Sequence, residues 1–341
     1  MPYPNIIRAA VVGLGRAGWN LHFQPLLKHG GFKIVAVADP VADRCQEAVN
    51  LTGCQQFNSI ENLLKSTDAE LVVVATPSST HYSDTIQVLQ SGRHCVTEKP
   101  MSLAADEAAN LVTLSRQTGK RLFIHHAHLH KAEFQHLRET IKSGLLGRLY
   151  HLRTFWGNYA RRWDWQTLKK NGGGQLNNTC PHTLSVVLPL LGAPVKSIYA
   201  DLRNIKDAGD AEDHVHLVMK AGNGVTADVV VTSAAVADIP KWTLCGEYGT
   251  LTSDGKKSIL RYYNPAEVPP LSVLDAAAPN RKYLKEALPW QEKQIDIPPS
   301  TIASFHENIH DVLTGKAEQI VTPESAAEVV RVSEMARLAA S

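Results

Sequence analysis

Short apolar runs alternate with longer stretches of mixed polarity along the first third of the chain. All but the last of these runs end at a proline or directly before a glycine, and such short apolar runs are typical of strands buried on both faces of a parallel sheet. They cover residues 6–12, 34–40, 71–77, 94–100 and 121–127. The stretches between them predict helices over residues 16–29, 41–52, 80–91 and 103–118. This alternation predicts a doubly wound parallel α/β domain over residues 1–124.

The pattern changes near residue 125. Residues 131–147 place Phe134, Leu137 and Ile141 at three-to-four spacing and predict a helix. Strand-like segments then follow, separated by turn signals such as Gly222-Asn223-Gly224. They cover residues 147–156, 195–203, 214–220, 225–234, 241–247 and 257–264. Strands without intervening helices predict an open, mainly antiparallel sheet in a second α/β domain, residues 125–341.

The end of the chain has a different character. Residues 265–299 contain the pairs Pro269-Pro270 and Pro298-Pro299, which predict an extended arm or a long loop. Helices are expected over about residues 301–314 and 323–340. The second begins at Thr322-Pro323, because threonine can cap a helix and proline fits its first turn.

Composition narrows the class of protein. A chain of 341 residues suits two domains, and a net charge of +2 with scattered basic residues argues against nucleic acid or a membrane surface as partner. Five widely spaced cysteines without a Cys-x-x-Cys pair favour a reducing compartment. We find neither a signal-peptide pattern nor an apolar run of membrane-spanning length, so we expect a soluble, cytoplasmic protein.

A glycine motif follows the first predicted strand. Gly13-x-Gly15-x-x-Gly18 stands between a strand and a helix, where a dinucleotide-binding loop requires it. Gly13 permits the turn, Gly15 lets the backbone approach a pyrophosphate, and Gly18 allows close helix packing. We expect the residues between them to contact the cofactor as well: Leu14, Arg16 and Ala17.

Other cofactor candidates end the next strands. Asp39 follows the second strand about 20 residues beyond the glycines, where a carboxylate can accept the adenosine ribose hydroxyls. It favours NAD over NADP, because a 2′-phosphate would meet its charge, although the nearby Arg44 could soften this preference. The loop after the third strand supplies further candidates: Ala75, Thr76, Pro77 and His81.

At Glu98-Lys99-Pro100 the sequence resembles the Gfo/Idh/MocA oxidoreductase family. The resemblance extends over nearly the whole chain and includes AAVVGLGRAG, ATPSSTHYSDTIQVLQSGRHCVTEKPMSLAADEA and GGGQLNNTCPHTLSVVLPLLGAPV. It implies a Rossmann domain, an α/β domain whose sheet face builds dimers or tetramers, and NAD(P)-dependent oxidation or reduction of sugars, inositols and related compounds.

The resemblance also implies catalytic residues. The family's catalytic lysine corresponds to Lys99, its catalytic histidine corresponds to His182, and Glu98 joins Lys99 among the residues expected beside the cofactor. The family motif has an aspartate where this chain has Asn178. An amide carries no charge and is no base, so Asn178 is expected to orient a substrate hydroxyl.

Two further segments offer substrate contacts. Residues 158–174 precede the second motif, and Arg162 and Trp163 could cover a sugar-like substrate. Along a strand, His126, His128 and His130 would share one face and could bind zinc. Because hydride transfer in the family needs no metal, we predict no metal site and assign His126 and His128 to substrate binding.

Three functions remain open at this point. The first is an NAD(H)-dependent dehydrogenase or reductase acting on a hydroxyl or keto carbon of a sugar, cyclitol or related small molecule. The second is an NAD-dependent glycosidase that oxidises its sugar transiently. The third is a non-catalytic NAD-binding sensor or partner protein. Net release of NADH separates the first from the second, and the retention of Lys99 and His182 argues against the third.

Overall fold

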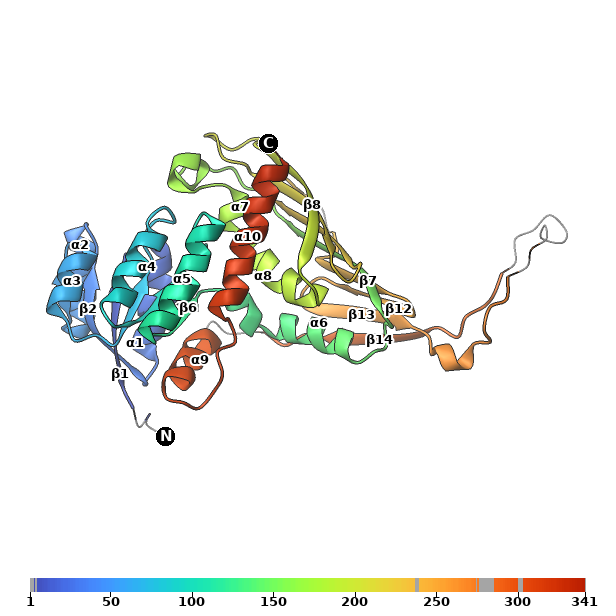
Figure 1. Cartoon of the computed structure of the whole chain (residues 1–341), viewed down its shortest axis with the longest axis horizontal. Helices are drawn as coiled ribbons and strands as arrows, with labels where there is room; N and C mark the ends of the chain where they lie inside the picture. The colour runs from blue at the N-terminus through green and yellow to red at the C-terminus, as the bar shows by residue number, and fades with distance from the viewer. Residues whose placement is uncertain are drawn as a thin grey trace.

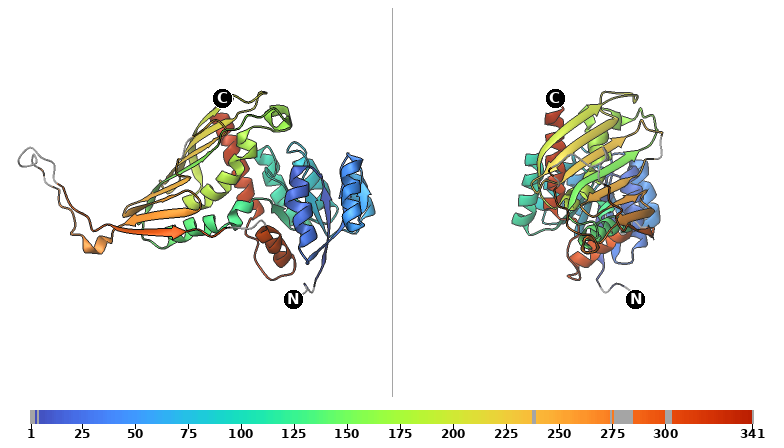
Figure 2. Two further views of the ribbon diagram at one scale, coloured as in Figure 1. Left: turned by 180° about the vertical axis from the view of Figure 1, so that it is seen from behind. Right: turned by 90° about the vertical axis from the view of Figure 1, so that its right-hand side faces the viewer.

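The computed structural model describes residues 3, 5–236, 239–273, 275, 285–299 and 303–340. Its two sheets stand at opposite ends of the molecule with helices between them (Figure 1). The first sheet belongs to the N-terminal third of the chain. The second slants across the other end and carries helices on one face only (Figure 2).

The first sheet has six parallel strands in the order β3-β2-β1-β4-β5-β6. This order is that of a Rossmann fold and confirms the predicted fold class. The strands are β1 (Ile7–Val12), β2 (Phe32–Ala38), β3 (Gln55–Phe57), β4 (Leu71–Val74), β5 (His94–Thr97) and β6 (Leu122–Ile124). The helices that follow strands are η1 (Gly18–Phe23), which continues as α1 (Gln24–Lys28), α2 (Ala42–Thr52), α3 (Ile60–Ser66), α4 (His81–Gln90) and α5 (Ala105–Thr118).

The sequence did not predict β3 or α3. β3 consists of Gln55, Gln56 and Phe57 at the edge of the sheet, and no residue in it is buried. An exposed edge strand needs no apolar run, so the hydrophobic pattern that predicted the central strands was absent here.

The second sheet has eight strands in the order β14-β13-β12-β11-β7-β10-β9-β8. β7 (Leu149–Gly157) and β10 (Thr226–Thr232) pair in parallel, and all other neighbours are antiparallel. The remaining strands are β8 (Val195–Arg203), β9 (His214–Ala221), β11 (Trp242–Gly246), β12 (Gly249–Ser253), β13 (Lys257–Tyr262) and β14 (Gln291–Asp296). The sheet is therefore mixed and mainly antiparallel, as the sequence predicted.

Helices cover the side of this sheet that faces the first domain (Figure 1). α8 (Cys180–Leu191) packs on β7 and β10, and α10 (Pro323–Ala339) packs on β8 and also on α5. η2 (Ala127–His130) and α6 (Ala132–Lys142) contact α8. Two domains thus meet through helices that touch both, and the loops between these helices lie at the junction.

The predicted arm over residues 265–299 is only partly irregular. Its described residues include a short helix, η5 (Pro265–Glu267), and β14 at the edge of the second sheet. Neighbouring residues extend away from the body of the molecule (Figure 1). The missed strand reads Gln-Glu-Lys-Gln-Ile-Asp and buries none of its residues, so no hydrophobic alternation could reveal it. Residues 274 and 276–284 of the predicted arm lie outside the described residues.

Helix α9 (Ala303–Leu313) returns to the first domain. Phe305, Ile309 and Val312 are at most 8% exposed and belong to the same apolar core as Ile7 and Phe32. A segment near the C-terminus therefore completes the core of the nucleotide-binding fold. The division into residues 1–124 and 125–341 stays a prediction.

The cysteines form no disulfide, and most of them are packed inside the protein. All five cysteines are free; Cys245 is half-buried and the other four are buried. Burial raises the pKa of Cys95 to about 12, so this thiol is inert at neutral pH. Over the described ranges, no helix combines the length and apolarity needed to cross a bilayer.

The face of the second sheet opposite α8 bears partly apolar side chains. Tyr199 on β8 is 59% exposed and its cross-strand neighbour Val218 on β9 is 40% exposed. Ile259 on β13 is 41% exposed. Exposed apolar residues gathered on one sheet face are typical of an interaction surface.

We expect this face to join two or four copies of the chain. Light scattering at micromolar concentration should give a dimeric or tetrameric mass. The double substitution Tyr199→Asp, Val218→Asp should shift the mass toward the monomer, because two opposed carboxylates would be desolvated at the interface. A monomeric wild type, or a variant with unchanged mass, would contradict this expectation.

Candidate active site

The glycine loop has the shape that a dinucleotide requires. Gly13 has φ +85°, and a Cβ there would lie 2.6 Å from the carbonyl oxygen of Ala75. A Cβ on Gly18 would lie 1.8 Å from the carbonyl oxygen of Gly13. A Cβ on Gly15, in contrast, would meet no atom within 4 Å. The backbone is therefore tight against the fold at Gly13 and Gly18 and open at Gly15, where a pyrophosphate approaches the helix N-terminus.

Asp39 lies beside this loop at the end of β2. It is 5% exposed, and its Oδ2 accepts the N–H of Leu14 at 2.7 Å while its Oδ1 accepts the N–H of Val41 at 2.9 Å. The half-exposed guanidinium of Arg44 is 3.5 Å from Oδ2. The carboxylate thus joins the glycine loop to β2 and remains next to the space where an adenosine ribose would bind.

The loop after β4 is joined to the segment that carries Lys99. His81 is 1% exposed, and its ring nitrogens lie 2.9 Å from the carbonyl oxygen of Thr76 and 2.7 Å from that of Pro100. Burial lowers the pKa of His81, although both carbonyls oppose this shift. Its side chain holds the two loops together, whereas Thr76 donates to Asp84 at 2.6 Å. Direct contact of these residues with a cofactor stays a prediction.

Lys99 reaches across the domain junction to the second motif. Its Nζ donates to the backbone oxygen of Asn178 at 2.8 Å and to the side-chain oxygen Oδ1 at 3.3 Å. Burial lowers the pKa of Lys99; Glu98 opposes this, and the positive charges of Arg16 and Arg162 reinforce it. The ammonium of Lys99 thus meets two carbonyl oxygens, and its pKa lies below the usual value of a lysine.

Glu98 is hydrogen-bonded to two histidines and to the backbone of Lys99. Its Oε1 accepts N–H groups of His22 at 2.9 Å and His125 at 2.8 Å, and its Oε2 accepts the backbone N–H of Lys99 at 3.2 Å. Burial by itself raises the pKa of Glu98, but the two imidazoles, His125 foremost, lower it well below its usual value. His306 lies 3.4 Å from the other nitrogen of His22 and extends this buried chain to α9.

The donor atoms of His22, Glu98 and His125 lie within 4.8 Å of one another. Their types would suit a metal ion. Each imidazole, however, points its N–H at the same carboxylate oxygen at hydrogen-bond distance. Hydrogen bonds therefore account for this arrangement, and we assign no metal to it.

His182 lies in the first turn of α8, four residues after Asn178. Its Nδ1 is buried and has no hydrogen-bond partner in the described part of the chain. Burial lowers its pKa well below the usual value, and the charge of Lys99 adds to this effect. His128 stands between His182 and Trp156, with ring centroids at 4.8 Å and 4.9 Å.

Burial also keeps the neighbouring imidazoles neutral. It lowers the pKa of both His126 and His128 to about 3. His126 is 2% exposed, with its Nδ1 unpartnered among the described residues. His130, the third histidine of the run, instead contacts the ring of Phe305 on α9 at 5.5 Å between centroids. The histidine run therefore divides between the catalytic cleft and the structural core.

The loop over residues 158–174 approaches the site through Gln166. Arg162 forms ion pairs with both oxygens of Asp164 and also donates to Gln166, whose Nε2 lies 3.5 Å from Oδ1 of Asn178. The loop thus brings Arg162 toward Lys99. Trp163 is 80% exposed, and none of the described contacts links it to Lys99 or His182.

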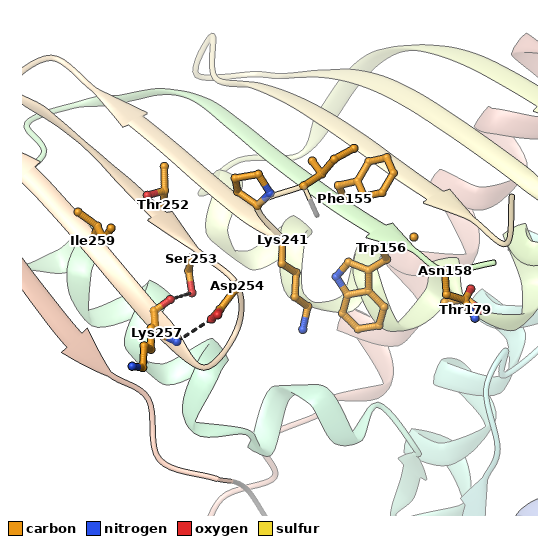
Figure 3. A pocket seen from close by; sticks show the side chains of 13 residues that line it. Phe155, Trp156, Asn158, Thr179, Lys241, Thr252, Ser253, Asp254, Lys257 and Ile259 are labelled. Atoms are coloured by element: carbon orange, nitrogen blue, oxygen red, sulfur yellow. Dashed lines mark hydrogen bonds between the residues drawn. The ribbon is translucent and has the colours of Figure 1, made fainter. Parts of the chain in front are cut away.

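A cavity of about 890 Å³ opens beside these residues. Thr179, the residue after Asn178, forms part of its wall together with Trp156 and Lys241. Figure 3 shows Trp156 and Lys241 side by side between the sheet and a helix, with Thr179 at one end and Lys257 at the other. The volume of the cavity is in the range of small-molecule binding sites, and Thr179 is the residue of its wall that adjoins Asn178 in the chain.

The sequence did not indicate that several of these residues lie close together. His22 and His306 are 284 positions apart. Trp156 lies near the end of β7 and Lys241 directly precedes β11, and these two strands are neighbours only in the folded sheet. No motif marks them. The strand pattern could have identified the strand ends, but not which side chains meet there.

Two family models match the chain. The model for the NAD-binding Rossmann fold of the Gfo/Idh/MocA oxidoreductase family matches residues 7–126. The model for the C-terminal domain of the same family matches residues 134–252. The two matched segments contain the glycine loop, Lys99 and His182.

Named relatives are distant. The scyllo-inositol 2-dehydrogenase (NADP(+)) of Bacillus subtilis is 23% identical over 97% of this chain and 92% of its own length. The D-glucoside 3-dehydrogenase of Escherichia coli is 28% identical over 57% of each chain. The crystal structure of the WlbA dehydrogenase from Bordetella pertussis, in complex with NADH and UDP-GlcNAcA, superposes with a TM-score of 0.80 at 21% identity. It covers 99% of this chain and 96% of its own, and at this identity it shows the fold alone.

We predict that Gly15→Val abolishes nucleotide binding without unfolding the protein. A Cβ at residue 15 meets no protein atom within 4 Å, so the valine side chain is expected to occupy the space where the pyrophosphate approaches. NADH fluorescence titration should show affinity reduced at least about tenfold, with little change in Tm.

Gly13→Ala is the matched control. Its positive φ and the contact with Ala75 make it costly for the fold itself. Gly13→Ala should therefore lower Tm. If the Gly15→Val protein still binds NADH as tightly as the wild type, the assignment of the loop to the cofactor is refuted.

Proposed function

Because the chain belongs to the Gfo/Idh/MocA oxidoreductase family, we propose that it is an NAD(H)-dependent dehydrogenase or reductase. Its substrate is a sugar, cyclitol or related small molecule with a reacting hydroxyl or keto carbon. The observation that carries the proposal is the contact between Lys99 and Asn178, four residues before His182, in a chain whose glycine loop is open at Gly15. The names of the inositol and glucoside dehydrogenases among its relatives support the substrate class.

The nicotinamide supplies hydride chemistry when bound, and the chain must handle the proton of the hydroxyl. Lys99 is suited to accept that proton. Its pKa is lowered by burial and by neighbouring positive charge, which favours the neutral amine that can accept a proton. After it takes the proton, the ammonium can donate to the two oxygens of Asn178 and stabilise negative charge on the substrate oxygen.

His182 has a different role in this proposal. With a pKa well below its usual range, it is a neutral imidazole at neutral pH. A neutral ring can donate one hydrogen bond and accept one, which suits the orientation of a substrate hydroxyl more than the storage of a proton. We assign the proton to Lys99 and the orientation of the reacting oxygen to His182.

Asn178 sets the protonation of Lys99. A carboxylate at residue 178 would pair with the ammonium, whereas an amide accepts the same hydrogen bond without charge. The amide therefore adds no negative charge at the ammonium, and the lowering of the Lys99 pKa by burial is opposed by Glu98.

We predict NADH formation when the NAD⁺-loaded protein meets a suitable polyol or sugar. Lys99→Ala and His182→Ala should each lower turnover by about 10²-fold or more while NADH still binds, because the loop contacts lie elsewhere. A screen of sugars, inositols and glycosides by NADH fluorescence and product analysis tests this. Glycoside cleavage without net NADH would favour a glycosidase, and full turnover by Lys99→Ala would overturn the mechanism.

Asn178→Asp should move the pH profile to higher pH. The new carboxylate, next to the ammonium, raises the pKa of Lys99, and only the neutral amine can accept a proton. The rising limb of kcat against pH in the direction of alcohol oxidation should therefore shift upward by about one unit, since an opposite charge within about 4–6 Å typically has this size of effect. An unchanged limb would exclude Lys99 as the proton acceptor.

We further propose that NAD(H) is preferred over NADP(H), because Asp39 places negative charge beside the ribose site. Asp39→Asn removes this charge but keeps an oxygen for the N–H of Leu14. It should reduce the ratio of NAD(H) to NADP(H) affinity at least about tenfold by paired titration. Equal or tighter NADP(H) binding by the wild type would contradict the proposal and give Arg44 the larger role.

A further inference from the structure

The side-chain amide of Asn178 is oriented by its neighbours. An ammonium group only donates hydrogen bonds, and Nζ of Lys99 donates to Oδ1 of Asn178 at 3.3 Å. The oxygen of the amide therefore faces Lys99. Nδ2 has no hydrogen-bond partner among the described residues, and in contrast to Nδ1 of His182 it is not one of the buried unpaired atoms. Its N–H groups are thus available to a ligand.

A second donor, Gln166, approaches the same oxygen. Its Nε2 lies 3.5 Å from Oδ1 of Asn178, and its Oε1 accepts an N–H of the Arg162 guanidinium. Because a guanidinium only donates, this contact determines which end of the Gln166 amide faces Asn178. Two cations, Arg162 and Lys99, therefore fix two amides in a chain in which donation runs from Arg162 through Gln166 to Asn178.

The backbone holds Gln166 in this place. Its N–H donates to Oδ1 of Asp164 at 2.9 Å, and its carbonyl oxygen accepts the N–H of Gly174 at 2.9 Å. A Cβ on Gly173 would collide with that carbonyl oxygen, so the loop packs closely on the glycines. Asn178 donates its own N–H to the carbonyl oxygen of Gly174 at 2.9 Å. The two amides are therefore placed relative to each other by one short stretch of backbone.

The ammonium of Lys99 orients Asn178 only while it is charged. In the proposed reaction Lys99 is a neutral amine when it accepts the proton of the substrate hydroxyl, and a neutral amine has a lone pair that also accepts hydrogen bonds. A reversed Asn178 amide would donate from Nδ2 to that lone pair and occupy the proton acceptor. Gln166 opposes this reversal, because its Nε2 would then meet another N–H group instead of an oxygen.

We propose that Gln166 is a positioning residue that keeps the oxygen of Asn178 toward Lys99, so that the lone pair of Lys99 and Nδ2 of Asn178 stay free for the substrate. Arg162 contributes by holding Gln166. The inference rests on the proposed dehydrogenase function, since it concerns the state in which Lys99 accepts a proton. Because Nδ2 only donates, the substrate atom that it binds is an acceptor, such as a hydroxyl or carbonyl oxygen.

Charged groups also act on Lys99 from several sides. Burial lowers its pKa, Glu98 opposes this shift, and Arg16 and Arg162 reinforce it. The charge of Lys99 in turn acts on three buried imidazoles, those of His81, His126 and His182. Gln166 is neutral, so its replacement by another neutral residue leaves all of these charges in place.

The first test needs no substrate. Protein labelled with [ε-¹³C]lysine is titrated by NMR, and the Lys99 signal is identified by its loss in Lys99→Met. Gln166→Met should lower the pKa of Lys99 by about half a unit or more, because the freed Asn178 amide can donate to the neutral amine. In the Asn178→Asp background no amide can reverse, so Gln166→Met should cause no such decrease there.

The second test measures turnover with NAD⁺ and D-glucose, myo-inositol or another polyol that gives NADH. Gln166→Met should lower the maximal kcat about fivefold or more and move the rising limb of kcat against pH to lower pH, since the neutral amine is stabilised but occupied. Gln166→Glu keeps the shape of the side chain and an oxygen for Arg162 but offers Asn178 an acceptor, so its maximal kcat should also fall. Lys170→Met, at an exposed residue of the same loop, is the matched control and should change neither quantity.

The inference is overturned if Gln166→Met leaves the pKa of Lys99 unchanged, or lowers it equally in the Asn178→Asp background. A lower Tm and a lower kcat without that pKa change would show a structural role only. NADH formation that neither Gln166 variant impairs would refute the positioning role and keep the dehydrogenase function. If the pKa of Lys99 responds as expected but no sugar yields NADH, the positioning of Asn178 stands and the dehydrogenase function fails.

Discussion

The carboxylate of Glu98 is the interaction on which the active site depends. It is 4% exposed, and it accepts N–H groups from His22 on η1, from His125 after β6 and from the backbone of Lys99. Through His22 it is also linked to His306 on α9. Four separate segments therefore converge on one buried charge. Removal of one partner from such a network typically costs about 3–5 kcal/mol, so these segments are expected to hold one arrangement.

Glu98 also helps to fix the position of Lys99. Lys99 begins from a backbone fixed by Glu98 and ends at a hydrogen bond with Asn178, so both ends of the residue are held. The domain junction is thereby closed by a bond between the first domain's lysine and the second domain's helix start. Burial is the main reason that the pKa values of both Lys99 and His182 are lowered. Few carboxylates remain to compensate, since Asn178 is neutral and Glu98 is committed to histidines.

The sequence predicted much of this site, for identifiable reasons. Gly13 and Gly18 are required by steric contacts of the local turn, and a motif records such requirements directly. Lys99 and His182 lie in motifs whose resemblance to a family implied their roles. Trp163 was proposed as a substrate contact because an aromatic ring precedes the second motif. In the structure it is 80% exposed. The sequence of a loop does not show in which direction a side chain points. Lys241 gave no signal, since single lysines are common on surfaces.

The hydrophobic pattern by itself determined the fold class. Buried central strands must be apolar, so β1, β2 and β4 were visible, while the exposed edge strands β3 and β14 were not. Local sequence also determined the open backbone at Gly15. Only the tertiary structure decided that Glu98 binds histidines from η1 and from the segment after β6, that His306 of α9 reaches His22, and that Asn178 meets Lys99. The reason is physical: sterics and burial act on neighbouring residues and leave periodic traces, whereas a hydrogen bond between segments far apart constrains single residues and leaves none.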